Sequence, residues 1–237
     1  MSAKFDSAWA EGILFSRAAR VGGVRVEFDD DERIVDMVDV ISALHQRRAV
    51  KHFDPNHKMP PETRERLLEA VLLTPSAFNL QNYRLVEVQD PNLRRSIRAV
   101  AWDQAQITDA SLLYIICGDL SAWKKNPARY WAHAPKPVQD FLVPGITTYY
   151  QDKPQVQRDE AMRSAGLIGM SLMLAAKDLG YDSCPMDGFD FDAVAKLINL
   201  PADHVVCFIV AIGKGIKDAW PRGERLPRSE TVIINRF

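Results

Sequence analysis

The run Leu112-Leu113-Tyr114-Ile115-Ile116-Cys117 constrains the fold of this chain more than any other feature. It is uninterrupted, apolar and rich in residues that favour strands, and such a run fits a strand covered on both faces. Val205 to Ile212 has the same character. Because helical patterns alternate with these strands along the chain, we predict a sheet sandwiched between helices, of the α/β or α+β class.

Helical periodicity predicts the elements that cover this sheet. Apolar residues recur every three or four positions in several segments, with prolines or acidic caps at some of their starts. We expect helices over 38–46, from Pro61 to before Pro75, and over about 92–100, 161–179 and 190–197. Short strands are expected over 85–88 and 231–234, and short helices with loops over 120–157.

The segment Ala161 to Leu179 is the most apolar of the expected helices. A helix that is apolar nearly all round must be buried, either inside the domain or between two copies of the chain. Its small residues, which include Gly166 and Gly169, permit close approach of another element. Ordinary packing in the core of one chain remains the simpler interpretation.

Residues 1–36 differ from the rest of the chain. They end in the acidic run Asp29 to Glu32 and lack long periodicity. We interpret them as an N-terminal extension, with a loosely packed, solvated terminus as the alternative. Residues 37–237 form the one expected domain.

Charge and cysteine usage narrow the class of protein. The net charge is -1, so nothing suggests a nucleic acid or an anionic membrane as partner. The three cysteines are far apart, and Cys117 and Cys207 lie inside apolar runs, which favours a reducing compartment over a disulfide framework. No segment approaches the ~20 apolar residues of a membrane span. We therefore expect a cytoplasmic protein.

Common catalytic signatures are missing from the sequence. The five histidines are scattered, and there is no CxxC or HExxH pattern, so we predict no metal site. Nor is there a dinucleotide fingerprint after a strand, a phosphate loop or a serine nucleophile elbow. Redox or transfer chemistry in this chain would have to come from a cofactor.

Three segments could hold a cofactor. Residues 47–53 (RRAVKHF) offer cations that could pair with a phosphate, residues 74–82 (TPSAFNLQN) offer small and amide side chains, and residues 184–189 (CPMDGF) follow an expected strand and let a ligand approach the backbone at Gly188. Taken singly, each has an ordinary alternative: a solvated basic helix end, a polar loop and a turn.

Together, these segments resemble the FMN-dependent nitroreductase family. The order R-R-x-x-K-x-F, then P-S-x-x-N-x-Q, then C-P-M-x-G-F is similar to that family, as is the basic tail 220–227 (WPRGERLP). The resemblance runs from about Val38 to Phe237. It implies a central, mostly antiparallel sheet flanked by helices, and an intertwined, obligate homodimer with FMN in a cleft between the two subunits.

The resemblance also assigns residues to the cofactor. Arg47 and Arg225 would hold the FMN phosphate with help from Arg222, and Lys51 would lie beside the N1/C2 edge of the ring and tune it. Arg48 and Ala49 are further expected contacts, and Gln106 would hydrogen-bond the pyrimidine side. Pro185 and Met186 would contact the cofactor, and the backbone N–H groups of Asp187 and Gly188 would face N5 and O4. The partner subunit would contribute Pro75, Ser76, Ala77 and Asn79.

The implied activity is electron transfer from NADH or NADPH to nitroaromatics, quinones or similar planar acceptors, by a ping-pong mechanism. No side chain need act as acid or base at the hydride step. Two alternative reactions within the same fold are flavin destruction and reductive dehalogenation. A third alternative is a non-catalytic flavin-binding protein.

The chain departs from the family pattern at two positions. Ala49 stands where the family often has Ser, and Asn82 stands where it often has Pro. The aromatic residues between Trp123 and Tyr150 would cover the pocket, and residues 231–234 would lie across the partner's sheet.

Overall fold

The computed structural model describes residues 18–21, 24–27 and 39–237. The chain divides into two compact units, Met1–Met37 and Val38–Phe237. In the first, β1 (Ala18–Val21) and β2 (Val24–Glu27) form an antiparallel hairpin. The acidic run at 29–32 lies outside the described residues, so an N-terminal extension over residues 1–36 stays a prediction.

Helices and strands alternate along the second unit. In chain order its elements are α1 (Val40–Gln46), α2 (Pro61–Val71), the 3-10 turn η1 (Ala77–Asn79), β3 (Tyr83–Glu87), α3 (Pro91–Ala99), α4 (Gln106–Asp109), β4 (Leu112–Asp119), the 3-10 turns η2 (Ala122–Lys124) and η3 (Pro127–Trp131), α5 (Lys136–Tyr150), α6 (Pro154–Asp178), β5 (Asp182–Met186), α7 (Phe191–Leu197), β6 (His204–Gly213) and α8 (Arg228–Thr231).

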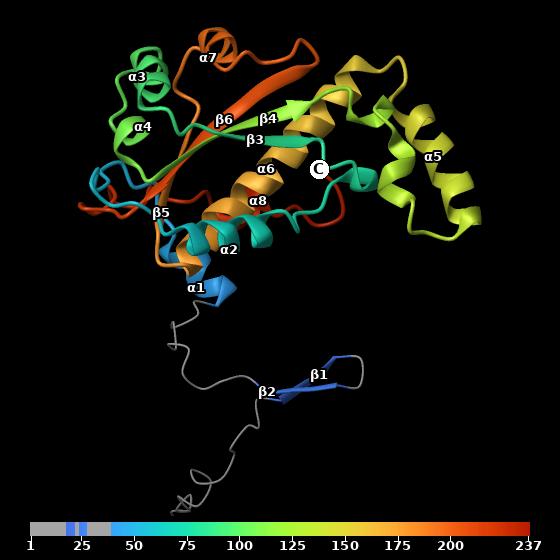
Figure 1. Ribbon diagram of the computed structural model, residues 1–237, viewed down its shortest axis with the longest axis horizontal. Helices are drawn as coiled ribbons and strands as arrows, with labels where there is room; N and C mark the ends of the chain where they lie inside the picture. Colours follow the sequence, from blue (N-terminus) through green and yellow to red (C-terminus); the bar gives the residue numbers. More distant parts are fainter. Residues whose placement is uncertain (1–17, 22–23, 28–38) are drawn as a thin grey trace, which may run out of the picture. The chain divides into compact units, whose positions relative to one another are not determined.

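A four-stranded antiparallel sheet of order β3-β4-β6-β5 forms the centre of this unit (Figure 1). Every residue of β4, which contains the apolar run 112–117, is buried. β6 lies beside it, pairing from Leu112↔Ile212 to Asp119↔His204 with a bulge between Ile116 and Cys117. The predicted α+β class and mostly antiparallel sheet are therefore confirmed.

Helices cover both faces of the sheet. On one face, α2 and α6 enclose a core that contains Tyr114 and Ile168. On the other face, α3, α4 and α7 enclose a core that contains Ile97 and Ile115. Successive residues of a strand point to opposite faces, so the neighbours Tyr114 and Ile115 belong to different cores. This two-sided cover explains why β4 carries no polar alternation.

Capping aspartates set the first residues of two of the predicted helices. The Asp39 side chain accepts hydrogen bonds from two backbone N–H groups at the start of α1, so that helix begins at Val40 rather than Val38. The Asp190 side chain accepts from the Ala193 N–H at 2.9 Å and caps α7. These carboxylates satisfy N–H groups that have no partner within the helix.

α6 starts at Pro154 and is longer than the predicted 161–179. Its inner side packs on the sheet through Ala165, Ile168 and Leu172, which are fully buried. Its opposite side is open in the single chain, where Leu167 is 48% exposed. The helix is therefore buried on one side only within one chain, so the expectation of a helix buried nearly all round is not met by the single chain.

The two central glycines of α6 face different surroundings. A Cβ on Gly169 would lie 2.2 Å from Cζ of Phe208 and 3.2 Å from Cδ1 of Ile116, whereas a Cβ on Gly166 would meet nothing within 4 Å. Overpacking a core costs about 1–3 kcal/mol. We therefore expect Gly169→Ala to lower the free energy of unfolding by about that amount in urea titrations. The matched control Gly166→Ala is expected to leave the folded chain's own stability unchanged or raise it by up to about 1 kcal/mol. Equal losses in both variants would contradict this placement.

The segment 120–157 differs from the prediction of short helices and loops. The 15 residues of α5 form one regular helix with Pro144 inside it, and α6 begins within the same segment. Phe141 is 78% exposed, while Ile146 and Tyr150 are buried against a small aromatic cluster. Apolar residues on both sides of α5, together with the internal proline, hide the helical period.

The predicted strand over 231–234 is wrong for the single chain. Residues 228–231 form α8, and Val232, Ile233 and Ile234 follow it as exposed residues. A strand needs a neighbour to satisfy its backbone groups, and no described strand of the same chain pairs with this tail.

Among the helices that the structure describes, none combines the length and the apolar character needed to span a membrane.

Candidate functional site

The basic segment after α1 lies against the edge of the sheet. Arg47 is the C-cap of α1, after which the chain is extended. The Val50 N–H donates to the Ser183 carbonyl of β5 at 3.1 Å. Val50 and Phe53 are buried in the core beneath α3 and α7. Because these two side chains anchor the segment, Arg47 remains only partly buried and Lys51 is exposed.

The C-terminal tail returns to this segment. Arg222 Nη2 donates to the carbonyls of His45, at 2.9 Å, and Arg47, at 3.1 Å. Arg48 in turn donates to the Trp220 carbonyl. These bonds join parts of the chain that are more than 170 positions apart. They also satisfy carbonyls at the end of α1 that have no partner within the helix.

Four guanidinium groups are thereby brought together: Arg47, Arg48, Arg222 and Arg225, which we call the arginine cluster. Burial lowers the pKa of Arg47, and repulsion by the other three cations lowers it further, Arg222 most strongly. None of the four forms an ion pair with a carboxylate in the part of the chain that the structure describes. Like charges held together without a counter-ion raise the free energy of the folded chain, and an anionic group would lower it.

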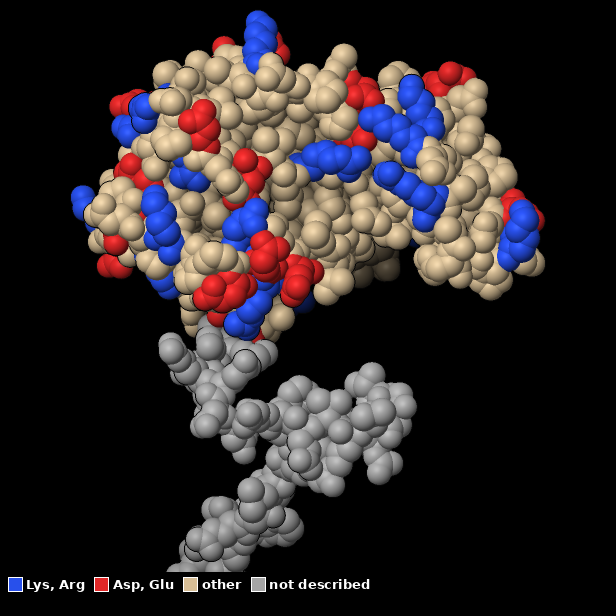
Figure 2. Space-filling view, viewed as in Figure 1, with Lys and Arg blue, Asp and Glu red and all other residues tan. Residues whose placement is uncertain are grey.

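One face of the molecule carries charges of both signs. On the face shown in Figure 2, lysine and arginine side chains lie interspersed with aspartate and glutamate. The arginine cluster is therefore a local arrangement in a chain whose net charge is -1. Such an arrangement suits one small anion rather than an extended polyanion.

A polar side chain from α4 lies on the inner side of the site. Gln106 is buried, and its Nε2 approaches Cys184 Sγ of β5 at 3.8 Å and Gln104 Oε1 at 3.1 Å. Burial raises the pKa of the Cys184 thiol, while Lys51 and Arg47 act in the opposite direction. The contact with Gln106 and the electrostatic effects of Lys51 and Arg47 on the thiol show that these three residues surround Cys184.

The segment 184–189 contains the end of a strand, which corrects the prediction that it follows one. Cys184, Pro185 and Met186 are the last residues of β5, because Cys184 and Met186 are buried on the sheet while Pro185 is tolerated on an edge strand. Asp187 and Gly188 come next. Neither backbone N–H has a hydrogen-bond partner among the described residues, so both are free to donate to a ligand.

Two tryptophans lie near this region. Trp102 was not among the predicted site residues, and Trp220 was singled out only as part of the basic tail 220–227. Trp102 is 81% exposed and lies so close to Gly188 that a Cβ there would come within 2.6 Å of its ring. The ring of Trp220 lies 4.2 Å from the Lys51 ammonium. Gln104 was also without a role, and its Nε2 donates to the Gly188 carbonyl at 2.9 Å. The one signal in the sequence that could have indicated Trp102 is its position directly before Asp103-Gln104-Ala105-Gln106, the stretch that contains the predicted contact Gln106.

The loop containing Pro75, Ser76, Ala77 and Asn79 does not join the site within one chain. It follows α2, whose 11 residues span about 16 Å. Its Phe78 packs against Tyr149 and Tyr150 of α5. No hydrogen bond between this loop and the arginine cluster occurs among the described residues.

The same loop has an unusual backbone. Phe78, Asn79 and Gln81 all have positive φ values, between 45° and 54°. The Ser76 Oγ holds this shape by accepting from the Gln81 N–H at 2.8 Å. Non-glycine residues in this region store strain, which is common in segments that bind ligands.

Comparisons with known proteins agree with this geometry. A model described as "Nitroreductase family" matches residues 44–214. "Protein DrgA" of Synechocystis sp. is 51% identical over 182 residues, covering 77% of this chain and 87% of the relative. "Putative NAD(P)H nitroreductase MhqN" of Bacillus subtilis is 32% identical over 203 residues, covering 83% of this chain and 98% of its own length.

Solved structures show the same fold. The crystal structure described as putative nitroreductase ydfN from Bacillus subtilis has a TM-score of 0.76 and 32% identity, and covers 81% of this chain and 97% of that one. A structure from Exiguobacterium sibiricum, described as a putative nitroreductase in complex with FMN, has a TM-score of 0.75 and 27% identity, covering 82% and 96%.

Proposed function

This chain belongs to the nitroreductase family, and we propose that it is an FMN-dependent oxidoreductase that transfers electrons from NAD(P)H to a planar organic acceptor. The observation that carries this proposal is the arginine cluster, which gathers four cations without a carboxylate partner among the described residues. A phosphate monoester carries close to two negative charges at pH 7, so the FMN phosphate supplies the counter-ion that the cluster lacks.

The remaining residues of the site fit the rest of the cofactor. Lys51 offers an ammonium group that stabilises negative charge beside it. Gln106 offers a buried amide, and the free N–H groups of Asp187 and Gly188 offer two fixed donors. When bound, FMN supplies the redox chemistry by accepting a hydride from NAD(P)H and giving its electrons to the acceptor. The chain itself binds and orients, because donors held in place need no reorganisation during the reaction.

Reductant and acceptor would use one place in turn, in a ping-pong order. The exposed rings of Trp102 and Trp220 offer apolar surface for planar molecules beside the site. We propose nitroaromatics as acceptors, in line with the names of the relatives, and quinones as planar acceptors of similar shape. All three cysteines are free and buried, which supports the expectation of a cytoplasmic, reducing environment.

The activity is tested directly by spectroscopy. We expect the purified protein to bind FMN. NADH or NADPH should then bleach the visible absorbance band of the bound flavin, at roughly 450 nm, under anaerobic conditions. Adding a quinone should then restore the band. A protein that stays yellow with both reductants would instead be a non-catalytic flavin binder.

We further propose that the working form is a homodimer in which each site combines the arginine cluster of one subunit with residues 75–79 of the other. Apolar side chains of α1 support a partner interface, since Val40 and Ile41 are more than 60% exposed in the single chain. Val232 to Ile234 in the tail are exposed as well. Large apolar side chains grouped on a surface commonly mark an interface.

Complementation between two inactive variants tests this shared site. Arg47→Ala removes the cluster's central cation, and Asn79→Gly removes an amide while permitting the positive φ at that position. Each variant alone should retain little FMN at a flavin concentration between the dissociation constants of the wild type and the variant. In a mixed dimer one site carries both changes and the other carries neither. Random pairing after co-expression should therefore restore about a quarter of the wild-type FMN sites. If both groups of residues act within one chain, co-expression restores none.

A further inference from the structure

A second cavity lies at the end of β3 and the start of β4, beneath α3. It has a volume of about 850 Å³, within the range of roughly 300–1,000 Å³ typical of small-molecule sites. Its floor includes Arg94, Met59 and Leu112, which are buried, and its rim includes Lys58 and Arg95, which are exposed. None of its lining residues belongs to the arginine cluster.

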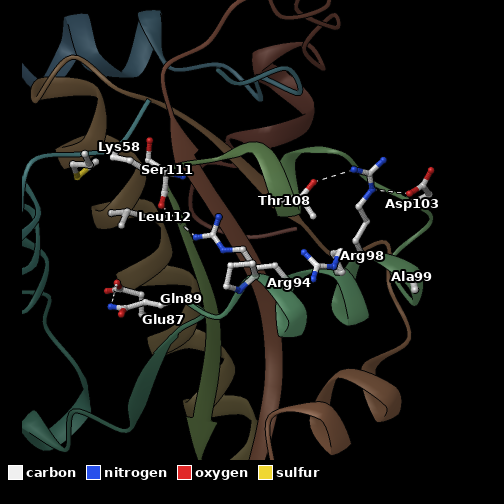
Figure 3. A pocket seen from close by; sticks show the side chains of 13 residues that line it. Lys58, Glu87, Gln89, Arg94, Arg98, Ala99, Asp103, Thr108, Ser111 and Leu112 are labelled. Carbon is white, nitrogen blue, oxygen red and sulfur yellow. Dashed lines mark hydrogen bonds and ion pairs between the residues drawn. The ribbon is translucent and has the colours of Figure 1, made fainter. Parts of the chain in front are cut away.

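The charges around this cavity do not balance. Its two acidic side chains are already paired: Glu87 with Arg64 at 2.7 Å, and Asp103 with Arg98 at 2.6 Å. Figure 3 shows the second pair at one end, where Arg98 also donates to Thr108. The remaining lining cations, Lys58, Arg94 and Arg95, have no ion pair with a carboxylate in the described part of the chain.

Arg94 is the central group on the floor. It is 8% exposed, and it donates from Nε to the Val88 carbonyl at 2.8 Å, from Nη1 to Ala110 at 2.5 Å and from Nη2 to Ser111 at 3.2 Å. Burial lowers its pKa, and the nearby Glu87 carboxylate acts in the opposite direction. Three neutral carbonyls accept three of the five N–H donors of a guanidinium, so donors remain, and among the described residues no carboxylate forms an ion pair with this cation.

Burying an unneutralised cation is costly, and an anion beside it offsets the cost. The rim cations are exposed and bond only neutral groups. Lys58 Nζ donates to the Pro55 carbonyl at 3.5 Å, and Arg95 donates to the side chain of Asn92. Since neither is paired with a carboxylate in the described part of the chain, both can turn toward a ligand. In Figure 3, Lys58 with Ser111 and Leu112 lies on one side of Arg94, and Arg98 lies on the other.

We propose that this cavity binds a small organic phosphate, separate from the flavin. Its phosphate would be held by Arg94, Arg95 and Lys58, which suit a dianion better than the single charge of a carboxylate. Its carbon skeleton would contact the apolar parts of the floor, Met59 and Leu112. The site does not depend on the proposed electron transfer.

Phenyl phosphate is a suitable probe, because it joins a phosphate to a flat apolar ring. We expect isothermal titration of the FMN-saturated protein to show saturable binding of one molecule per chain, without release of FMN. Binding should weaken as ionic strength rises. Inorganic phosphate, which lacks the ring, and benzoate, which carries one charge, should each bind at least tenfold more weakly.

A double variant on the rim tests the placement without disturbing the buried Arg94. Lys58→Gln with Arg95→Gln should raise the dissociation constant of phenyl phosphate at least tenfold. The matched control, Arg66→Gln with Lys196→Gln, removes the same charge from exposed positions outside the cavity and should bind as the wild type does. Equal affinity in the two double variants, displacement of FMN by the probe, or no saturable binding at millimolar concentration would each overturn the proposal. These readouts are heat and FMN content, so they are independent of whether NAD(P)H reduces the protein.

Discussion

Replacing Arg47 with alanine is expected to weaken FMN binding by about tenfold to a hundredfold. A hydrogen bond to a charged group contributes about 1.5–3 kcal/mol, and each 1.4 kcal/mol is a factor of about ten in affinity. Arg47 is partly buried, as is Arg48, and the three other arginines of the cluster repel it. The negative charge of the FMN phosphate would attract each guanidinium and so offset the repulsion among the four arginines. Titration of the flavin-free protein with FMN, followed by flavin fluorescence, measures the change.

The same substitution should not destabilise the flavin-free protein. Removing one of four mutually repelling cations relieves a cost of the folded state, so the denaturation midpoint without FMN should stay the same or rise. Arg225→Ala should also reduce FMN occupancy after dialysis, by a smaller factor because Arg225 is exposed. Arg66→Ala, far along the chain on exposed α2 surface, is the control. An Arg47→Ala protein that keeps its FMN but unfolds more easily would show that Arg47 has a structural role instead.

Replacing Lys51 with alanine is expected to lower the midpoint potential of bound FMN. Reduction adds negative charge, and a fixed ammonium beside the ring favours the reduced form. Two unit charges 4 Å apart interact by about 4 kcal/mol at an effective dielectric near 20. For a two-electron couple about 30 mV corresponds to 1.4 kcal/mol, so the upper limit is roughly 80 mV. Because Lys51 is exposed, solvent screening should reduce the shift to a few tens of millivolts.

Spectroelectrochemistry of wild type, Lys51→Ala and Lys51→Arg separates charge from shape. The arginine variant keeps the charge and should retain most of the wild-type potential. In the single chain the Lys51 ammonium lies over the Trp220 ring, a contact that also favours the cation. An unchanged midpoint potential in the alanine variant would show that Lys51 does not lie beside the N1/C2 edge of the flavin ring.

Several elements of the fold followed from short stretches of sequence. β4 and β6 were predictable because a strand covered on both faces must be apolar throughout. α7 was predictable because a capping aspartate leaves a local signature. The basic segment, the 184–189 segment and the tail could be identified as candidates by their order. α5 could not, because its amphipathic pattern is broken by Pro144 and by exposed Phe141.

By itself, the sequence determined β3, β4, β6 and most helices, since periodicity and caps act over a few neighbouring positions, and it indicated the segments that could hold a cofactor. Only the tertiary structure decided that Arg222 lies against the end of α1, that Trp102 lies on Gly188 and that Arg94 forms the charged floor of a second cavity. The contacts of Trp102 and Arg222 join segments more than 80 and more than 170 positions apart, respectively. They depend on strand pairing and helix packing over the whole domain, which no local pattern encodes.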